Sequence, residues 1–175
     1  MSSSEPANLS EWRGKGGRLF TCGRPGRATF GRQRQQIDED TINLWVIGLP
    51  RAKVLHIVSL LGQKTDGFSE FAYYPFRSSR EFGTKPTFQE WLDQRYSHRF
   101  VVHEFPTTDA RGIQPDLLDA VKHRVLSLIA SGETVVVVDS AGAERTARVC
   151  EAVGFKRGPT KACPSHPHRF EGRAE

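Results

Sequence analysis

Four valines at positions 135–138 lead directly into a loop of small residues, and an arginine and a threonine follow the loop. The loop consists of Asp139, Ser140, Ala141, Gly142, Ala143 and Glu144, and the next two residues are Arg145 and Thr146. Small side chains allow the backbone N–H groups of a loop and of a following helix to converge on one anion. A guanidinium beside those groups can donate two parallel hydrogen bonds to a phosphate. The pattern therefore predicts a phosphate-binding loop from Ser140 to Arg145. A plain strand–loop–helix connection with an exposed arginine is the simpler alternative.

The segments on both sides of this loop have the patterns of a strand and of two helices. The valine run is apolar at consecutive positions, as in a parallel strand that is covered on both faces. Residues 115–130 form one apolar face at helical spacing, made of Leu117, Leu118, Val121, Val125, Leu128 and Ile129. Residues 146–153 are predicted to form a short helix that ends at Gly154. We therefore expect the loop between the end of a central strand and the start of a helix.

Four more strands and one more helix are predicted upstream of this unit. The strands are expected at residues 42–50, 56–62, 71–76 and 99–105. Within the polar segment 77–99, apolar residues recur at helical spacing and predict a helix packed on the flank of the domain, with Phe88, Trp91, Leu92 and Tyr96 on its core face. Because strands alternate with helices, the chain is predicted to be an α/β protein. The expected fold has three layers, with helices on both faces of a mostly parallel central sheet.

The segment from Ser140 to Thr146 resembles the signature loop of the cysteine-dependent protein phosphatases, Cys-x5-Arg-Ser/Thr. The strands predicted at 42–50 and 56–62 also resemble the start of a dual-specificity phosphatase domain. The resemblance covers about residues 42–153, with 77–99 as an insertion and with the usual last helices missing. It implies a tyrosine phosphatase-like fold, shortened at the C-terminus, and the hydrolysis of phosphoric monoesters.

The resemblance also implies roles for individual residues. Arg145 and Thr146 match the Arg-Ser/Thr pair that completes the catalytic loop. Asp109 lies about thirty residues upstream of the loop, within residues 105–116, and matches the general acid of the family. That acid protonates the leaving oxygen of the phosphoester and then activates water.

The chain departs from the family at the central chemical group, because Asp139 stands where the family has its nucleophilic cysteine and Val138 stands where a histidine usually precedes it. A carboxylate is a poorer nucleophile toward phosphorus than a thiolate, and enzymes that use one rely on Mg²⁺ to neutralise the site. We therefore expect the chain to lack phosphatase activity by the cysteine route. We also expect Asp139 to accept the N–H bonds of the loop and to pair with Arg145.

The predicted function is that of a degenerate, catalytically impaired phosphatase-like domain that binds a protein partner or a phosphorylated ligand, either a protein or a small phosphoester. One alternative is an active phosphoric-ester hydrolase with an atypical loop. Another is an inactive rhodanese-like domain, which also has an arginine loop and a helix ending in Gly154-Phe155. The loop that carries Asp109 favours the phosphatase interpretation.

A second Cys-x5-Arg pattern occurs from Cys163 to Arg169, but it contains two prolines and no glycine and has no preceding strand. We do not interpret it as a phosphatase loop. Its histidines lack the paired-cysteine spacing of a zinc site, so no metal and no cofactor are expected.

The charge distribution predicts three segments. Seven lysines and arginines lie between Arg13 and Arg34, where no acidic residue occurs, and the whole chain carries a net charge of +5. We predict a basic, flexible arm at 1–36, a phosphatase-like α/β domain at 37–157 and a tail containing proline and histidine at 158–175. Contact between the arm and nucleic acid is the lowest-ranked interpretation.

Cysteine content and hydropathy bear on the compartment. Three cysteines provide no paired disulfide framework, which favours a reducing environment. The longest strictly apolar run is the four valines, far shorter than a membrane span. A cytoplasmic protein without a membrane partner is expected.

Overall fold

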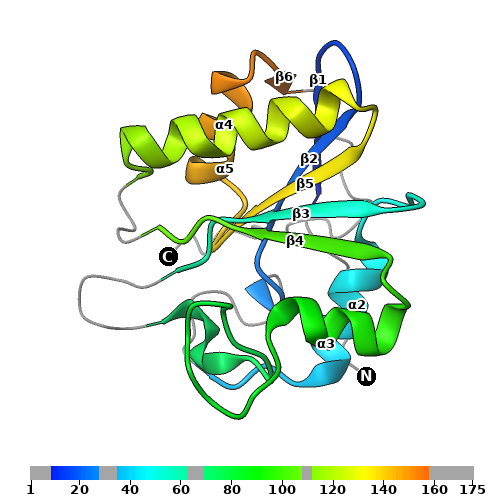
Figure 1. Ribbon diagram of the computed structural model, residues 1–175, viewed down its shortest axis with the longest axis vertical. Helices are drawn as coiled ribbons and strands as arrows, with labels where there is room; N and C mark the ends of the chain where they lie inside the picture. Colours follow the sequence, from blue (N-terminus) through cyan, green and yellow to red (C-terminus); the bar gives the residue numbers. More distant parts are fainter. Residues whose placement is uncertain (1–8, 28–34, 63–68, 108–111, 158–175) are drawn as a thin grey trace, which may run out of the picture.

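The computed structural model describes residues 9–27, 35–62, 69–107 and 112–157. Its strands are β1 (Ser10–Arg13), β2 (Arg18–Gly23), β3 (Leu55–Ser59), β4 (Phe100–Glu104), β5 (Thr134–Asp139) and β6 (Lys156–Arg157). They form one sheet in the order β4-β3-β5-β2-β1-β6 (Figure 1). Strands β2 to β5 are parallel, while β1 and β6 add an antiparallel edge. Since β5 lies between β3 and β2, the prediction that the valine run is a central strand is confirmed.

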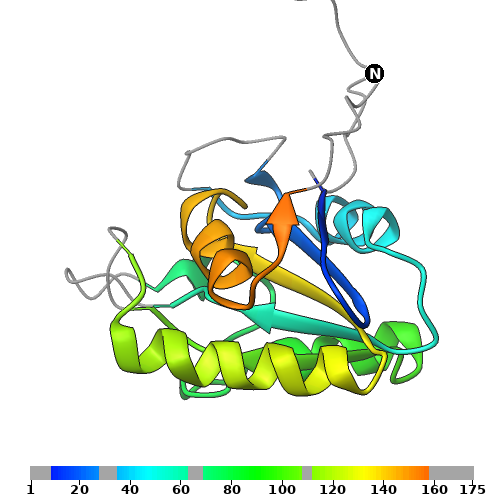
Figure 2. The same cartoon turned by 90° about the horizontal axis from the view of Figure 1, so that it is seen from above.

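Helices cover both faces of this sheet. The described helices are α2 (Glu39–Gly48), α3 (Phe88–Tyr96), α4 (Pro115–Ala130), α5 (Glu144–Ala152) and the short 3-10 helix η1 (Glu70–Tyr73). α4 and α5 lie on one face, and α2, α3 and η1 lie on the other (Figures 1 and 2). Val135 and Val137 pack toward the first face, and Val136 and Val138 pack toward the second. The predicted three-layer α/β arrangement with a mostly parallel sheet is therefore confirmed.

Several elements form where the sequence predicts them. α4 has the predicted bounds, with Pro115 in its first turn, where a missing N–H costs nothing. α3 begins with a capping box, in which Thr87 and Glu90 exchange side-chain and backbone hydrogen bonds. It ends before Ser97 and His98, which both adopt positive φ. β4 lies within its predicted range. β3 begins one residue before its predicted range and ends three residues short of it, and α5 begins two residues earlier than predicted.

Residues 42–50, predicted as a strand, instead belong to helix α2 and the turn after it. The helix is capped by Asp38, whose carboxylate accepts a hydrogen bond from the Thr41 N–H at 2.7 Å. Three apolar residues spaced three and four apart then face the core, namely Ile42, Trp45 and Val46. The cap and the helical spacing outweigh the apolar, strand-like composition of this segment.

Residues 71–76 are also not a strand. They form η1 and the turn that follows it, where aromatic rings pack on one another. The rings of Tyr74 and Phe76 stack with centroids 4.9 Å apart, and Phe76 stacks on Phe88 of α3 at 4.3 Å. Packing of the rings between the sheet and α3 replaces the backbone pairing that a strand would need.

The prediction of a flexible arm is wrong for residues 10–23, which form β1 and β2. β2 pairs with β5 along its whole length, from Arg18 beside Thr134 to Gly23 beside Asp139. Leu19 and Cys22 are completely buried. Burial of this short apolar stretch on both faces of the sheet stabilises the fold by more than the desolvation of the flanking charges costs. The domain therefore includes this segment. The predicted tail, 158–175, lies outside the described residues.

The longest helix that the structure describes is α4, with 16 residues. Among the described helices, none combines the length and the apolar character that crossing a bilayer requires.

Candidate functional site

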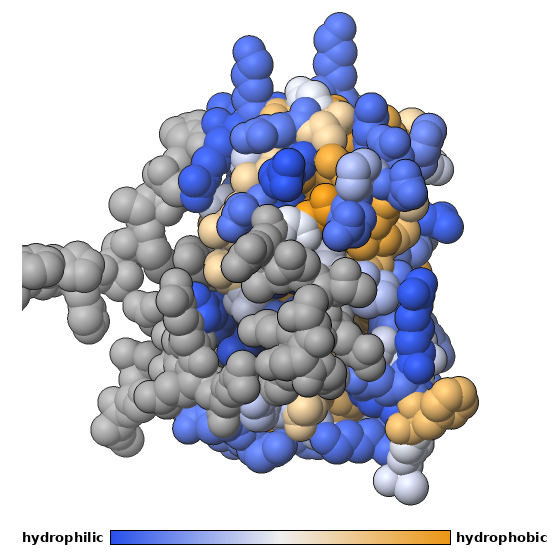
Figure 3. Space-filling model, turned by 90° about the vertical axis from the view of Figure 1, so that its left-hand side faces the viewer, coloured by the Kyte–Doolittle hydropathy of each residue, from blue (hydrophilic) through white to orange (hydrophobic). Residues whose placement is uncertain are grey.

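The loop from Asp139 to Thr146, called the loop site below, lies at the edge of the sheet where the parallel strands end. β3 ends at Ser59, β4 ends at Glu104, and β5 ends at Asp139 itself. Ligands of open parallel sheets bind outside the carboxyl ends of the strands. Figure 3 faces this edge and shows a largely hydrophilic surface among the coloured residues. The fold thus brings the predicted loop to the position where such sheets bind ligands.

Asp139 is 2 % exposed, and its carboxylate is held by backbone donors of the loop site. One carboxylate oxygen accepts from the N–H of Ala141 at 2.8 Å and also from the N–H of Gly142. The other accepts from the N–H of Thr146, in the first turn of α5, at 3.1 Å. The prediction that Asp139 accepts the N–H bonds of the loop is confirmed. The carboxylate occupies the positive end of the helix, which favours a negative charge.

Gly142 allows the loop to close around this carboxylate. Its φ is +69°, a conformation that is accessible to glycine at little cost. A Cβ atom at this position would lie 2.3 Å from the backbone nitrogen of Gly23 and 2.4 Å from the carbonyl carbon of Cys22. The loop therefore packs directly on the end of β2, and only glycine fits there.

Arg145 is 7 % exposed and points to the ends of β3 and β4. One of its terminal nitrogens donates to the carbonyl of Leu60 at 3.0 Å and to the hydroxyl of Thr107 at 2.5 Å. The same nitrogen lies 3.6 Å from a carboxylate oxygen of Glu70, which is also buried. That oxygen of Glu70 additionally accepts from the N–H of Gly62 at 3.1 Å. The guanidinium is thus held by one anion and two neutral oxygens.

The predicted ion pair between Asp139 and Arg145 is wrong, because the acidic partner of Arg145 is Glu70. The two loop residues point in different directions. Asp139 turns toward the start of α5, whereas Arg145 reaches across the ends of the neighbouring strands. Loop donors satisfy the carboxylate and Glu70 balances the guanidinium, so the two charges are compensated separately.

Thr107 is a residue of this site whose role the sequence did not indicate. It is buried, and its hydroxyl donates to the carbonyl of Leu60 at 2.8 Å while it accepts from Arg145. Its backbone lies against Gly62, where an added Cβ would come within 2.5 Å of the Thr107 carbonyl oxygen. Thr107 therefore ties together the segments that follow β3 and β4. Neither Thr107 nor Glu70 stands out locally, since a loop threonine and a helix-start glutamate are common.

Two buried hydroxyls near the strand ends have no hydrogen-bond partner among the described residues. They belong to Thr146, which is fully buried, and to Ser59 at the end of β3. The threonine predicted to belong to the catalytic loop thus keeps its hydroxyl inside, next to the backbone N–H that Asp139 binds. Such an unpaired group costs stability and is uncommon in folded proteins.

The remaining predicted loop residues lie at the surface. The side chains of Ala141, Ala143 and Glu144 are exposed, and Ser140 and Gly142 are half-buried. Asp109, the predicted general acid, lies outside the described residues, so its distance from the loop site is not part of the structure.

The described cysteines do not supply a thiolate. Cys22 lies beside the end of β5, where burial, and after it the charge of Asp139, raises the pKa of its thiol. Burial likewise raises the pKa of Cys150 on α5, with a smaller contribution from Glu151. Both residues are neutral thiols in the core and are poor nucleophiles.

No family model, no curated protein and no solved structure matches this chain. Within the described part of the chain, no group of three or more histidine, cysteine or acidic side chains is arranged to hold a metal ion. The chemical interpretation of the loop site therefore depends on its own geometry.

Proposed function

We propose that this chain is a phosphatase-like domain that does not hydrolyse phosphoesters, because its own carboxylate occupies the phosphate position, and that it serves to bind a protein partner. The observation that carries the proposal is the carboxylate of Asp139, which accepts hydrogen bonds from three backbone N–H groups of the loop site. These are the donors that a phosphate would need.

The geometry of Asp139 argues against a nucleophilic role. Attack on phosphorus needs a free lone pair directed at the reacting atom, with the charge of the phosphate neutralised. Both carboxylate oxygens are bound by N–H donors, and the residue is almost completely buried. Arg145, the group that would balance the phosphate, already contacts Glu70. Hydrolysis would therefore require both residues to leave their partners.

The experiment is the hydrolysis of p-nitrophenyl phosphate by the chain and by its Asp139→Asn and Arg145→Ala variants. We expect the chain to show no turnover above that of either variant, and Cys22 and Cys150, the cysteines that the structure describes, are buried and offer no other route. Asp139→Cys is the positive control, since it places a thiol that can form a thiolate at the position of the nucleophile in the phosphatase family. Turnover by the chain that is lost in Asp139→Asn would overturn the proposal and make the chain an active hydrolase.

Binding of a phosphorylated ligand at the loop site is the second candidate. It is favoured by the surface position of the loop between Ser140 and Glu144, which leaves the site open on one side. Saturable binding of a phosphopeptide that is lost in Arg145→Ala would support this candidate. Binding that depends on neither loop residue would favour a protein partner on a neighbouring surface.

A further inference from the structure

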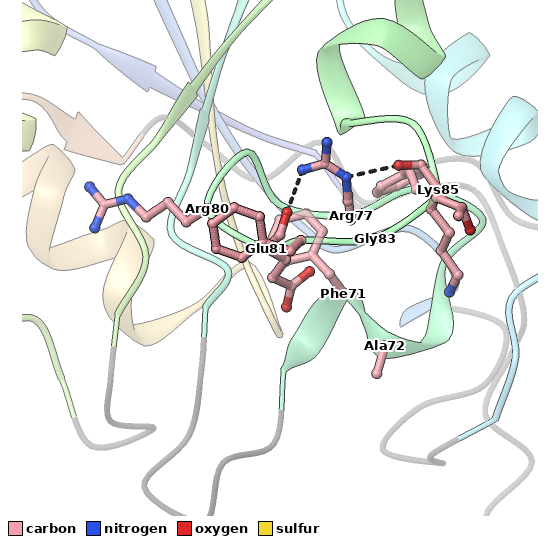
Figure 4. A pocket seen from close by; sticks show the side chains of 10 residues that line it. Phe71, Ala72, Arg77, Arg80, Glu81, Gly83 and Lys85 are labelled. Carbon is pink, nitrogen blue, oxygen red and sulfur yellow. Dashed lines mark hydrogen bonds between the residues drawn. The ribbon is translucent and has the colours of Figure 1, made fainter.

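A hollow of about 590 Å³ lies between η1 and the segment of residues 76–85 that leads toward α3. Phe71 and Phe76 line it and are buried, while the charged rim includes Arg77, Arg80 and Lys85 (Figure 4). A second hollow of about 260 Å³ shares Phe71 and Arg80 with the first and extends to Gly62, Pro106 and Thr107. The two hollows together lead from the aromatic cluster to the residue that binds Arg145.

The rim carries an excess of positive charge. Arg77 donates to the backbone carbonyls of Lys85, at 2.8 Å, and of Ser78, at 3.1 Å, and Figure 4 shows it turned toward the Lys85 carbonyl. The ammonium of Lys85 donates to the carbonyl of Tyr74 at 2.8 Å. Carbonyl oxygens are neutral and do not balance the charge of either side chain, and Arg77 additionally interacts with the charge of Glu90.

Arg80 is exposed, and among the described residues its guanidinium has no ion pair. Figure 4 shows its side chain extended away from Phe71 and Lys85, and it lines both hollows. Against three cations, the residues that line the hollow include one carboxylate, that of Glu81, which accepts a hydrogen bond from the Ser78 N–H. Glu104 does not line the hollow and is bound by the hydroxyls of Ser78 and Ser79. A planar guanidinium that has no acidic partner in the described part of the chain is suited to binding a carboxylate.

Phe82 supplies the apolar part of the rim. Its relative exposure is 103 %, so the ring contacts essentially nothing else in the domain. A large aromatic side chain that is fully exposed at the edge of a hollow is typical of a surface that binds a partner. Aromatic residues and arginines contribute much of the binding energy at protein interfaces. The ring stands next to Glu81 and within two residues of Arg80 in the sequence.

The segment that carries these residues is held in place at both ends. The carbonyl and N–H of Arg77 bond to Phe88 and Pro86, at 3.0 and 2.9 Å. Glu104, at the end of β4, accepts from the hydroxyls of Ser78 and Ser79 at 2.7 Å each. The hollow is therefore formed before any ligand arrives, which lowers the entropic cost of binding.

We propose that this hollow is the docking site for an acidic peptide segment of a partner protein, whose carboxylates bind Arg80 and the neighbouring cations while an apolar side chain packs on Phe82. This inference rests on the proposed non-catalytic binding function and names its site and partner chemistry. Charge complementarity selects an acidic segment, since the rim has three cations and one anion.

The test selects random linear peptides on phage against the whole protein at low ionic strength. The enriched peptides are then synthesised, and their affinities are measured by fluorescence anisotropy for the parent and for two variants, Arg80→Glu and Phe82→Ser. Arg51→Glu is the matched control for Arg80→Glu, and Ile47→Ser is the matched control for Phe82→Ser. Both side chains are exposed, and they lie in or just after α2, near the end of the sheet where the parallel strands begin.

We expect acidic peptides with an apolar residue to be enriched, and we expect each of the two variants to weaken their binding by about tenfold while the controls change it by less than about twofold. Enrichment of peptides without acidic residues, equal binding to Arg80→Glu, or no enrichment at all would overturn the docking site. The aryl phosphate assay separates the two proposals. Turnover by the parent would overturn the proposed function alone, and peptides that bind away from the hollow would overturn this inference alone.

Discussion

Replacing Asp139 with alanine tests whether its carboxylate supports the loop, because the change removes the acceptor of three N–H groups at once. Thr146 is completely buried, so water could reach its N–H only through the space that the carboxylate leaves, and the loss of this partner costs about 1–3 kcal/mol. Ala141 is exposed and Gly142 is half-buried, so water can replace those bonds at about 0.5 kcal/mol each. Loss of the negative charge at the start of α5 adds about 0.5 kcal/mol.

Taken together, these terms predict that Asp139→Ala lowers the free energy of unfolding by about 3 kcal/mol. For a chain of this length, that corresponds to a fall in Tm of about 6–12 °C. Denaturation by urea, followed by circular dichroism, gives the free energy. Asp116→Ala is the matched control, since Asp116 is an exposed acid in the first turn of α4 without such a role, and its effect should stay below about 0.5 kcal/mol.

The vacated loop should also accept an external anion. At a phosphate concentration about tenfold above the dissociation constant, binding would restore about 1.4 kcal/mol to Asp139→Ala. The parent should gain nothing comparable, since its N–H groups are already bound. The reasoning is refuted if Asp139→Ala is as stable as the parent, or if phosphate stabilises both proteins equally.

Three further changes have defined outcomes. Glu70→Gln removes the acidic partner of Arg145 and leaves a buried cation without its anion, so it should lower the free energy of unfolding in urea by about 2 kcal/mol. An unchanged midpoint of urea denaturation would show that the pair contributes nothing to stability. Gly142→Ala should cost more than about 3 kcal/mol because of the backbone overlap at β2, whereas Gly132→Ala, at a similar positive φ of +78° but in open space, should cost about 1 kcal/mol; equal effects would contradict the close approach. Burial lowers the pKa of His103 to about 4, and the charges of His56 and Arg124 contribute to this shift. As the pH falls below about 6.5, His103 is therefore protonated in the unfolded chain but stays neutral in the folded protein. The contribution of His103 to the free energy of unfolding should therefore be fully present above about pH 6.5 and should fall by about 1 kcal/mol toward pH 4, after discounting for partial exposure. Urea denaturation at several pH values should show a weaker pH dependence of this free energy in His103→Gln.

The sequence predicted the parts of the fold whose signals are local and strong. The spacing of apolar residues set the bounds of α4, and the valine run identified β5, because burial on both faces leaves no room for polar positions. The small residues after β5 also predicted the loop that holds the carboxylate of Asp139.

Features that depend on distant contacts were missed. β2 is a core strand because it lies between β5 and β1, and nothing within its six residues distinguishes that position from a short hairpin. The segment at 42–50 is apolar enough for a strand, and the cap at Asp38 and contacts of its helical face with the core determine the helix.

The acidic partner of Arg145 was also missed, because it comes from a distant part of the sequence. Asp139 and Arg145 lie at the two ends of one short loop, six positions apart in the sequence, which suggested a pair. Glu70 becomes the partner of Arg145 only because η1 follows β3 and brings its first residue to the strand ends. Local patterns indicate which groups can form a site, while the topology decides which of them meet.

The most direct measurement of the central claim is a titration of the parent protein with inorganic phosphate, followed by the backbone amide NMR signals of Ala141, Gly142 and Thr146. If the carboxylate of Asp139 holds these three N–H groups, their signals should not move in the parent and should shift with saturation in Asp139→Ala. Saturable shifts of the same three amides in the parent would contradict the claim that the loop is already occupied by its own carboxylate.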